Sequence, residues 1–152
     1  DMLLKKELIT SILLEMIVGE ASQLYNDLYD EGLINDSFDI SYEGERDYGF
    51  SAMSGESPNP KLVKEKILSA ISKMELDKEE FERAKKVEQG RFLRLWNSVD
   101  KLSNNMISYI FRNIDVFKFS EICEGITLDE AKSRFESHFT PENCVLSIIN
   151  PY

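Results

Sequence analysis

The first thirty residues contain two helical patterns of apolar positions. Across residues 4–17, apolar side chains recur every three or four positions, which is the spacing of one helical face. Gly19 interrupts the pattern, at a cost of about 1 kcal/mol relative to alanine, and the pattern resumes across residues 21–28. We therefore expect two helices with a break near Gly19, and Gly32 as the stop of the second.

The next segment changes to a period of two. Apolar and polar residues alternate across residues 38–42 and again across residues 48–52, and residues 44–47 between them are turn-forming. This alternation is typical of strands that bury one face. We expect a hairpin in which Phe38, Phe50 and their in-phase neighbours cover a core on one side. Met53 falls out of phase, which indicates partial cover on the other face.

Helix-start signals divide the rest of the chain. Residues 59–60 (Asn-Pro) combine a capping residue with proline at a first helical position. Residues 77–80 form a variant of the capping box, and residues 127–130 form a further box. The helix after residue 77 has an apolar stripe that is broken only by Glu88, and it continues or bends into a further helix near residue 99.

A third strand is expected at residues 144–149, after a turn at residues 140–143. The order of helix, hairpin, several helices and one strand favours an α+β fold with an antiparallel sheet of about three strands. Three strands are few for so many helices, so helices pack in two layers or further strands lie outside this sequence. We treat residues 1–152 as one domain, and Asp1 within a helical pattern suggests a piece of something longer.

Composition limits the classes of function. The chain has 152 residues, with 18 basic and 28 acidic side chains and a formal net charge of −10. This acidic balance argues against nucleic acid or an anionic membrane as the main partner. The sequence has neither a run of about 20 apolar residues nor a recognisable leader, so we expect a cytoplasmic location.

Catalytic and metal-binding signals are weak. His138 is the single histidine, and we expect it to act as a partly exposed cap at a helix end. Cys123 and Cys144 are interpreted as buried free thiols, with a Cys–His pair as the remote alternative. No H-x-x-E-H pair, paired CxxC or phosphate-binding loop can be built from these residues.

One helix carries a short basic stripe, which consists of Lys85, Lys86, Arg91 and Arg94. We expect these side chains to pair with glutamates of the same helix, as in Glu82 with Lys86, and anion binding is the alternative. Glu79 and its acidic neighbours are interpreted as a solvated helix start. Trp96 is expected in the core.

Residues 12–35 contain an ordered set of positions that resembles a known signature, namely Gly19, Ser22, Leu24, Tyr25, Leu28, Gly32 and Leu33. The hairpin with Gly49-Phe50 and the run Glu-Glu-Phe-Glu-Arg-Ala-Lys at residues 79–85 follow in matching order. The chain thereby resembles the non-catalytic, C-terminal half-domain of bacterial insulinase/pitrilysin-like zinc peptidases, the inverzincins. The resemblance extends over nearly the whole chain.

The resemblance implies a protein of two similar α+β units that enclose a peptide chamber. Zinc would lie in the first unit, on an H-x-x-E-H motif that this sequence lacks, so we expect no cofactor in this segment. The chain would be the later part of the second unit, without its opening strands. Its expected partners are the N-terminal catalytic unit of the same chain, a partner peptidase-like chain and a peptide substrate.

The resemblance also implies substrate-binding positions. Family members place an arginine where this chain has Tyr29 and a tyrosine where it has Asn35. Tyr29 cannot supply a permanent cation to a developing oxyanion, and Asn35 offers only a neutral amide. We therefore expect no catalytic residue here, and Tyr29, Asn35, Ser22 and Tyr25 as substrate-contacting residues.

Three functions remain open. The first is the chamber-closing unit of a zinc peptidase, contacting peptide through the strand edge near residues 37–42. The second is a catalytically inactive homologue that serves as a structural or assembly subunit, and the third is an unrelated binding module. Without the opening strands, an uncovered apolar sheet edge would let the fragment pair with itself.

Overall fold

The computed structural model describes residues 2–45 and 47–150. Asp1 and Arg46, which lies in the expected turn, are outside the described residues. Within them the chain forms α1 (Met2–Val18), α2 (Gln23–Asp30), β1 (Asp39–Gly44), β2 (Gly49–Ser54), α3 (Pro60–Lys73), α4 (Lys78–Leu95), α5 (Val99–Phe111), the 3₁₀ turn η1 (Val116–Lys118), α6 (Phe119–Gly125), α7 (Leu128–His138) and the 3₁₀ turn η2 (Pro141–Asn143). The expected α+β class is confirmed.

Local capping chemistry sets several helix boundaries. Gly32 follows α2 with φ of 68°, a conformation that favours glycine. The side chain of Asn59 accepts a hydrogen bond from the first turn of α3, and that of Asp77 accepts two from the first turn of α4. Thr127 and Glu130 form a complete capping box at α7. These expected boundaries are confirmed.

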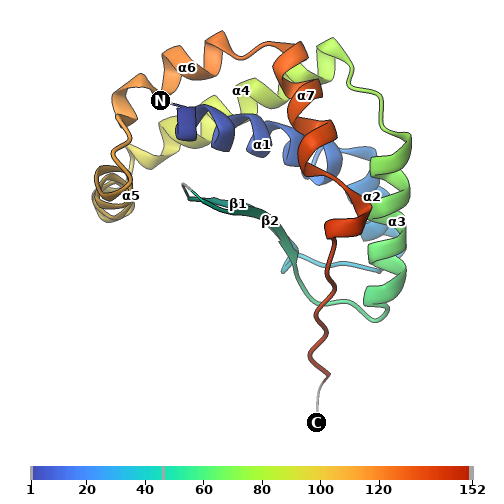
Figure 1. Cartoon of the computed structure of the whole chain (residues 1–152). Coiled ribbons are helices and arrows are strands. Elements are labelled where there is room, and N and C mark those ends of the chain that lie inside the picture. Colours follow the sequence, from blue (N-terminus) through green and yellow to red (C-terminus); the bar gives the residue numbers. More distant parts are fainter. Residues whose placement is uncertain (1, 46, 151–152) are drawn as a thin grey trace.

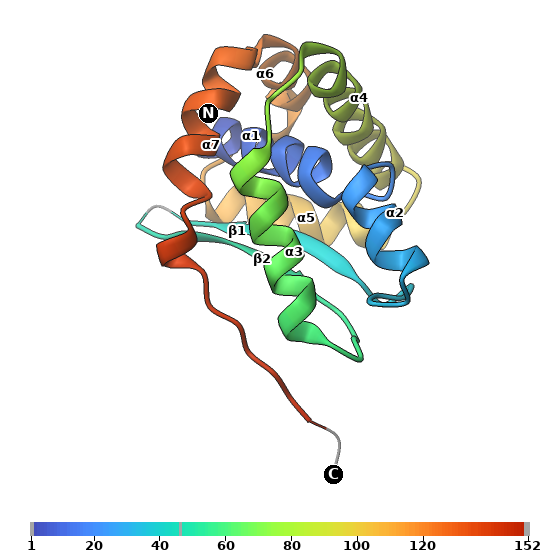
Figure 2. The same ribbon diagram turned by 90° about the vertical axis from the view of Figure 1, so that its right-hand side faces the viewer.

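Helix α1 lies at the centre of the molecule, between the hairpin and an outer set of helices that includes α4, α6 and α7 (Figures 1 and 2). Most of its side chains are buried. The main core joins it to four other segments and includes Leu4, Leu8, Ile12, Leu13, Phe81, Ala84, Phe92, Ile114, Phe119, Cys123 and Ala131. Cys123 is a buried free thiol, as expected.

A smaller core lies beside the main one, around α2 and α3. Its buried members are Leu28, Leu33, Ile34, Val63 and Ile67. Phe38 and Met53 from the hairpin region pack against this cluster. The second cluster therefore fixes the end of α2, and with it the loop that leads into β1.

The second strand of the hairpin turns a different face to the core from the one expected. Tyr42 pairs with Ser51 and Glu43 pairs with Phe50 across the two strands. Since paired residues share a face, Phe50 lies opposite to the face that carries Tyr42 and Met53, and its side chain is 52% exposed. The expected grouping of Phe38 with Phe50 is wrong, because a shift of one residue moves a strand's side chains to the other face.

Two glycines favour the observed register. Gly44 and Gly49 pair with each other, and a Cβ at either position would clash with the ring of Tyr42. The Tyr42 hydroxyl accepts a hydrogen bond from Nη2 of Arg134 on α7 at 3.2 Å. The inner face of the hairpin thus contacts α7 as well as α1.

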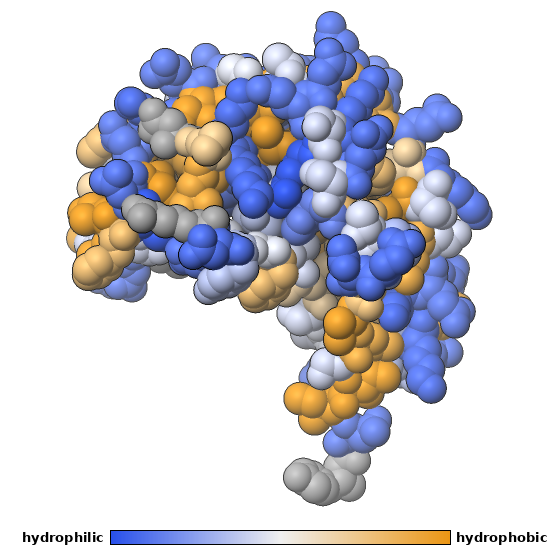
Figure 3. Space-filling view, viewed as in Figure 1, coloured by the Kyte–Doolittle hydropathy of each residue, from blue (hydrophilic) through white to orange (hydrophobic). Residues whose placement is uncertain are grey.

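Residues 144–149 run extended, but within the described residues they do not pair with a strand. The expected third strand is therefore absent from the two-stranded sheet. The segment leads away from the hairpin, and its hydrophobic side chains are visible in Figure 3. Val145 and Ile149 are 90% and 95% exposed, and Cys144 is exposed rather than buried as we expected.

Candidate functional site

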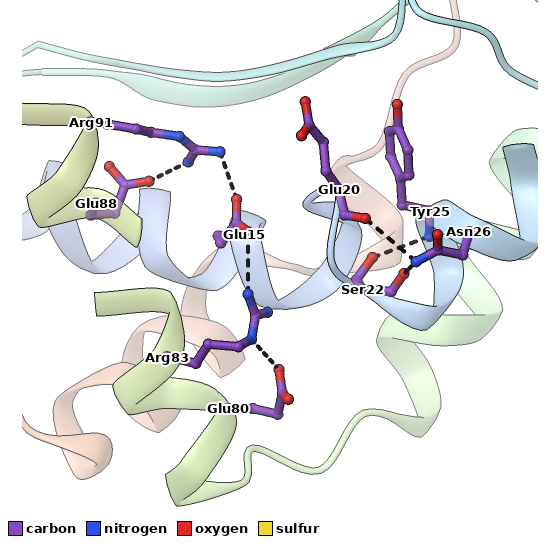
Figure 4. Close-up of polar contacts among 9 residues, drawn as sticks. All are labelled: Glu15, Glu20, Ser22, Tyr25, Asn26, Glu80, Arg83, Glu88 and Arg91. Atoms are coloured by element: carbon purple, nitrogen blue, oxygen red, sulfur yellow. Dashed lines mark hydrogen bonds and ion pairs between the residues drawn. The ribbon is translucent and has the colours of Figure 1, made fainter. Parts of the chain in front are cut away.

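The candidate site begins at the bend between α1 and α2, where the resemblance places Ser22 and Tyr25. The Ser22 hydroxyl accepts a hydrogen bond from the backbone N–H of Tyr25 at 3.1 Å and caps α2. The side chain of Asn26 donates to the carbonyl oxygens of Ser22 and Glu20 (Figure 4). Ser22 is only 7% exposed, so its hydroxyl stabilises the start of α2 and does not face solvent.

Tyr25 and Tyr29 form a short aromatic row on α2. Their ring centroids lie 6.1 Å apart at an interplanar angle of 16°, and Tyr25 also meets Phe38 edge-on at 6.2 Å. The Tyr29 hydroxyl donates to the carboxylate of Asp36 at 3.1 Å, and this hydrogen bond raises the pKa of Tyr29 above its ordinary value. Tyr29 is 44% exposed, so the row presents one aromatic face to solvent.

Asn35 occupies the loop between α2 and β1. Its Oδ1 accepts hydrogen bonds from the Ser37 backbone N–H at 2.9 Å and from the Ser37 hydroxyl at 2.6 Å. Its Nδ2 donates to the carboxylate of Glu56 at 3.2 Å. The Asn35 side chain therefore ties the start of β1 to the loop that follows β2.

The structure connects the four expected substrate-contacting residues through local contacts. Ser22 caps the helix that carries Tyr25 and Tyr29, and Tyr29 bonds to Asp36, the neighbour of Asn35. Asn35 and Tyr29 are exposed, while Ser22 is buried. Their role in binding substrate stays a prediction.

Sequence reasoning missed a buried carboxylate, Glu15, beneath this region. Glu15 is 2% exposed, and its Oε2 lies 2.7 Å from Nη2 of Arg91 on α4. Its other oxygen lies 3.6 Å from Nη1 of Arg83, so one carboxylate joins α1 to two arginines of α4 (Figure 4). Arg83 also pairs with Glu80 at 3.0 Å. The Glu80 side chain therefore does not complete the expected capping box with Asp77.

Glu88 belongs to the same network. Its carboxylate lies 2.5 Å from Nη1 of Arg91. Burial raises the pKa of Glu88 above its usual range, and the attraction of Arg91 offsets this only in part. In the sequence, the signal for this buried network was the single acid, Glu88, within the apolar stripe, because a buried acid requires a cation nearby.

The basic stripe of α4 is mostly structural. Lys85 is buried, and its ammonium group donates to the carbonyl oxygens of Glu124 and Ile126, both at 3.0 Å. Glu82 lies 3.9 Å from Lys85, rather than forming the expected pair with Lys86. Trp96 is 43% exposed at the end of α4, so its expected core position is wrong.

His138 is more than a helix-end cap. Its Nε2 lies 2.8 Å from the Ser51 hydroxyl, and its ring meets Tyr42 edge-on at 5.5 Å, which joins α7 to the hairpin. Burial, with smaller contributions from Arg134 and Lys6, lowers the pKa of His138 to about 4.

This lowered pKa predicts a stability loss on acidification. Unfolded His138 takes up a proton below pH 6.5 and the folded side chain only near pH 4, so stability falls as the pH falls between these values. Because the ring is half-buried, we expect a loss of about 1–2 kcal/mol. Urea titrations at pH 7 and pH 4.5 should show a smaller decrease in the free energy of unfolding for His138→Gln than for the unsubstituted chain. An equal loss in both proteins would contradict the prediction.

No group of three or more potential metal-ligating side chains occurs among residues 2–45 and 47–150. In the same ranges, none of the helices combines the length and the apolar character that a membrane crossing requires. The chemistry offered by the site is thus hydrogen bonding, aromatic contact and negative charge.

Known proteins provide an independent comparison. No model of a known protein family matches the chain. It is 29% identical to the uncharacterized zinc protease YmfH of Bacillus subtilis, over 98% of this chain and 35% of that protein. It is also similar to the crystal structure of an M16-like peptidase from Alicyclobacillus acidocaldarius, with a TM-score of 0.85 and 28% identity over 92% of this chain and 34% of the other.

The chain thus spans about a third of the length of each of these proteins. Both similarities agree with the family that the sequence resembles. The resemblance to the insulinase/pitrilysin-like (M16) peptidase family is thereby confirmed, for a part of such a protein.

Proposed function

We propose that this chain is a non-catalytic unit of a zinc-dependent peptidase, and that it closes the substrate chamber and contacts peptide. The observation that supports this most is the match of 98% of the chain to one third of a protein named a zinc protease. The zinc and its H-x-x-E-H motif would belong to the N-terminal unit of the same protein. The chain would then be the later part of the second unit.

The peptide contact is proposed at the free edge of β1. Within the described residues β1 pairs only with β2, so the backbone groups of its other edge have no strand partner. An extended peptide can add to such an edge as a further strand. Asn35 lies in the loop that leads into this strand, and Tyr29 lies just before that loop, on α2. Both positions agree with the expected contact to substrate.

The test is a titration of the ¹⁵N-labelled chain with an uncharged ten-residue peptide of alternating threonine and valine. We expect chemical-shift changes concentrated at the amides of residues 37–44, because new backbone hydrogen bonds form there. Shifts confined to α5 or to the C-terminal tail, or no shifts at all, would overturn the proposal.

A second candidate is a catalytically inactive homologue with a structural or assembly role. Tyr29 and Asn35 favour it, since both side chains are engaged in hydrogen bonds within the chain and neither is cationic. The whole protein would distinguish the two, because only the peptidase would lose peptide hydrolysis when zinc is removed by a chelator.

A further inference from the structure

The hairpin has an outward face that no helix of the described residues covers. The register assigns to this face Asp39, Ser41, Glu43, Phe50, Ala52 and Ser54. The inward face packs towards α1 and α7, and α1, α4 and α6 lie on that side in both views (Figures 1 and 2). Asp39 and Glu43 are exposed, as is the ring of Phe50.

Most of the net negative charge of the chain belongs to the segment that contains this hairpin. Residues 20–56 contain ten acidic side chains and one basic side chain, Arg46, so this segment has a formal charge of −9 out of −10 for the whole chain. The other 115 residues are nearly neutral. A cationic ligand that approaches the outward face of β1 therefore meets side chains of a strongly acidic segment.

Two of these acids are available to a ligand. Asp36 and Glu56 already accept hydrogen bonds from Tyr29 and Asn35. Asp39 and Glu43, in contrast, form no ion pair with any residue that the structure describes. They lie four residues apart on one face of β1, roughly 13 Å along the strand.

We infer that this chain selects extended peptides with two basic side chains four residues apart, an inference that rests on the proposed peptide contact at β1. A peptide strand on the free edge of β1 would alternate its side chains between the two faces. Residues four apart in the peptide would both lie on the outward face, one beside Asp39 and the other beside Glu43. Opposite charges at neighbouring cross-strand positions stabilise the pairing, and Phe50 adds apolar surface to the same face.

The experiment measures fluorescence anisotropy of three labelled ten-residue peptides with the 152-residue chain. Two peptides have the same composition with two lysines, placed four residues apart in one and three apart in the other. The third is the uncharged threonine–valine peptide. We expect the first to bind about threefold more tightly than the second, whose lysines point to opposite faces.

Paired variants locate the effect. Asp39→Asn with Glu43→Gln should abolish the preference for the four-residue spacing. Glu121→Gln with Glu136→Gln removes the same charge from exposed positions on α6 and α7. This control variant should keep the preference for the four-residue spacing. Circular dichroism melts verify that both variants fold.

The outcomes separate this inference from the proposed function. Equal binding of all three peptides at β1 keeps the peptide contact and overturns the charge selection. Equal binding of the two lysine peptides shows attraction by net charge alone and also overturns it. A preference that survives in Asp39→Asn with Glu43→Gln assigns the spacing effect to other residues, which overturns the inference as well. Binding of no peptide overturns both proposals. A β1 edge protected by dimerisation, detected by sedimentation and hydrogen exchange, assigns the edge to a second copy and overturns the inference.

Discussion

Replacement of Glu15 by alanine should destabilise the chain by about 3 kcal/mol. The carboxylate is almost fully buried and bonds to Arg91 and Arg83, so its removal takes the shared anion from two arginines of α4. A buried pair broken on one side costs about 3–5 kcal/mol. We expect the lower end, because the side chains of Arg91 and Arg83 are 43% and 31% exposed and can turn to solvent.

The measurement is the free energy of unfolding in urea at pH 7. Glu15→Gln keeps the volume and removes the charge, so it separates electrostatics from packing. It should also lower the pKa of Glu88, since the charge of Glu15 contributes to raising it. NMR titration of the Glu88 carboxyl measures this effect.

Glu80→Ala is the matched control, because Glu80 pairs with the same Arg83 but its side chain is 55% exposed. Its loss should cost less than about 1 kcal/mol. Comparable effects of the two alanine variants would show that the Glu15 network contributes no more than a surface ion pair.

Replacement of Leu28 by alanine should also cost about 3 kcal/mol, within the 2–5 kcal/mol typical of buried leucines. Leu28 is fully buried in the second cluster, between α2, α3 and the residues after α2. Its backbone carbonyl also accepts hydrogen bonds from the N–H groups of Leu33 and Ile34. The cavity would therefore loosen the segment that positions Asn35 and the start of β1.

Hydrogen exchange locates this second effect. Amides of α2 and α3 should exchange faster, while those of the main core around Phe81 keep their protection, because local openings involve contiguous packed units. Leu93→Ala is the control, since Leu93 on α4 is 65% exposed. Uniform loss of protection over the whole chain would contradict an independent role of the second cluster.

The helix boundaries could be predicted because their signals are local. Asn59, Asp77 and Thr127 each satisfy backbone N–H groups within three residues, so neighbouring positions suffice to identify them. The same holds for Gly32, whose positive φ ends α2. The motif order across residues 12–35 then indicated the peptidase resemblance that the comparisons confirm.

The candidate site was predictable only in part. Ser22, Tyr25, Tyr29 and Asn35 were identified by the resemblance, but their hydrogen bonds depend on residues up to 21 positions away, as in Asn35 with Glu56. Glu15 gave no signal, because one acid in an apolar helix does not reveal the arginines of a helix some 70 residues later. His138 looked like a cap because Ser51 lies 87 positions before it.

The sequence by itself therefore determined most of the helices, though not α6, the existence of a hairpin and the α+β class, since capping and periodicity act over a few residues. Only the tertiary structure decided the hairpin register, the burial of Glu15 and Lys85, and the lack of a strand partner for residues 144–149 within the described part of the chain. The register depends on the space that Gly44 and Gly49 leave for the Tyr42 ring. The burial of Glu15 and Lys85 depends on which helices, distant in sequence, pack together. A strand pattern specifies an extended backbone, whereas pairing requires a partner edge that the strand itself does not encode.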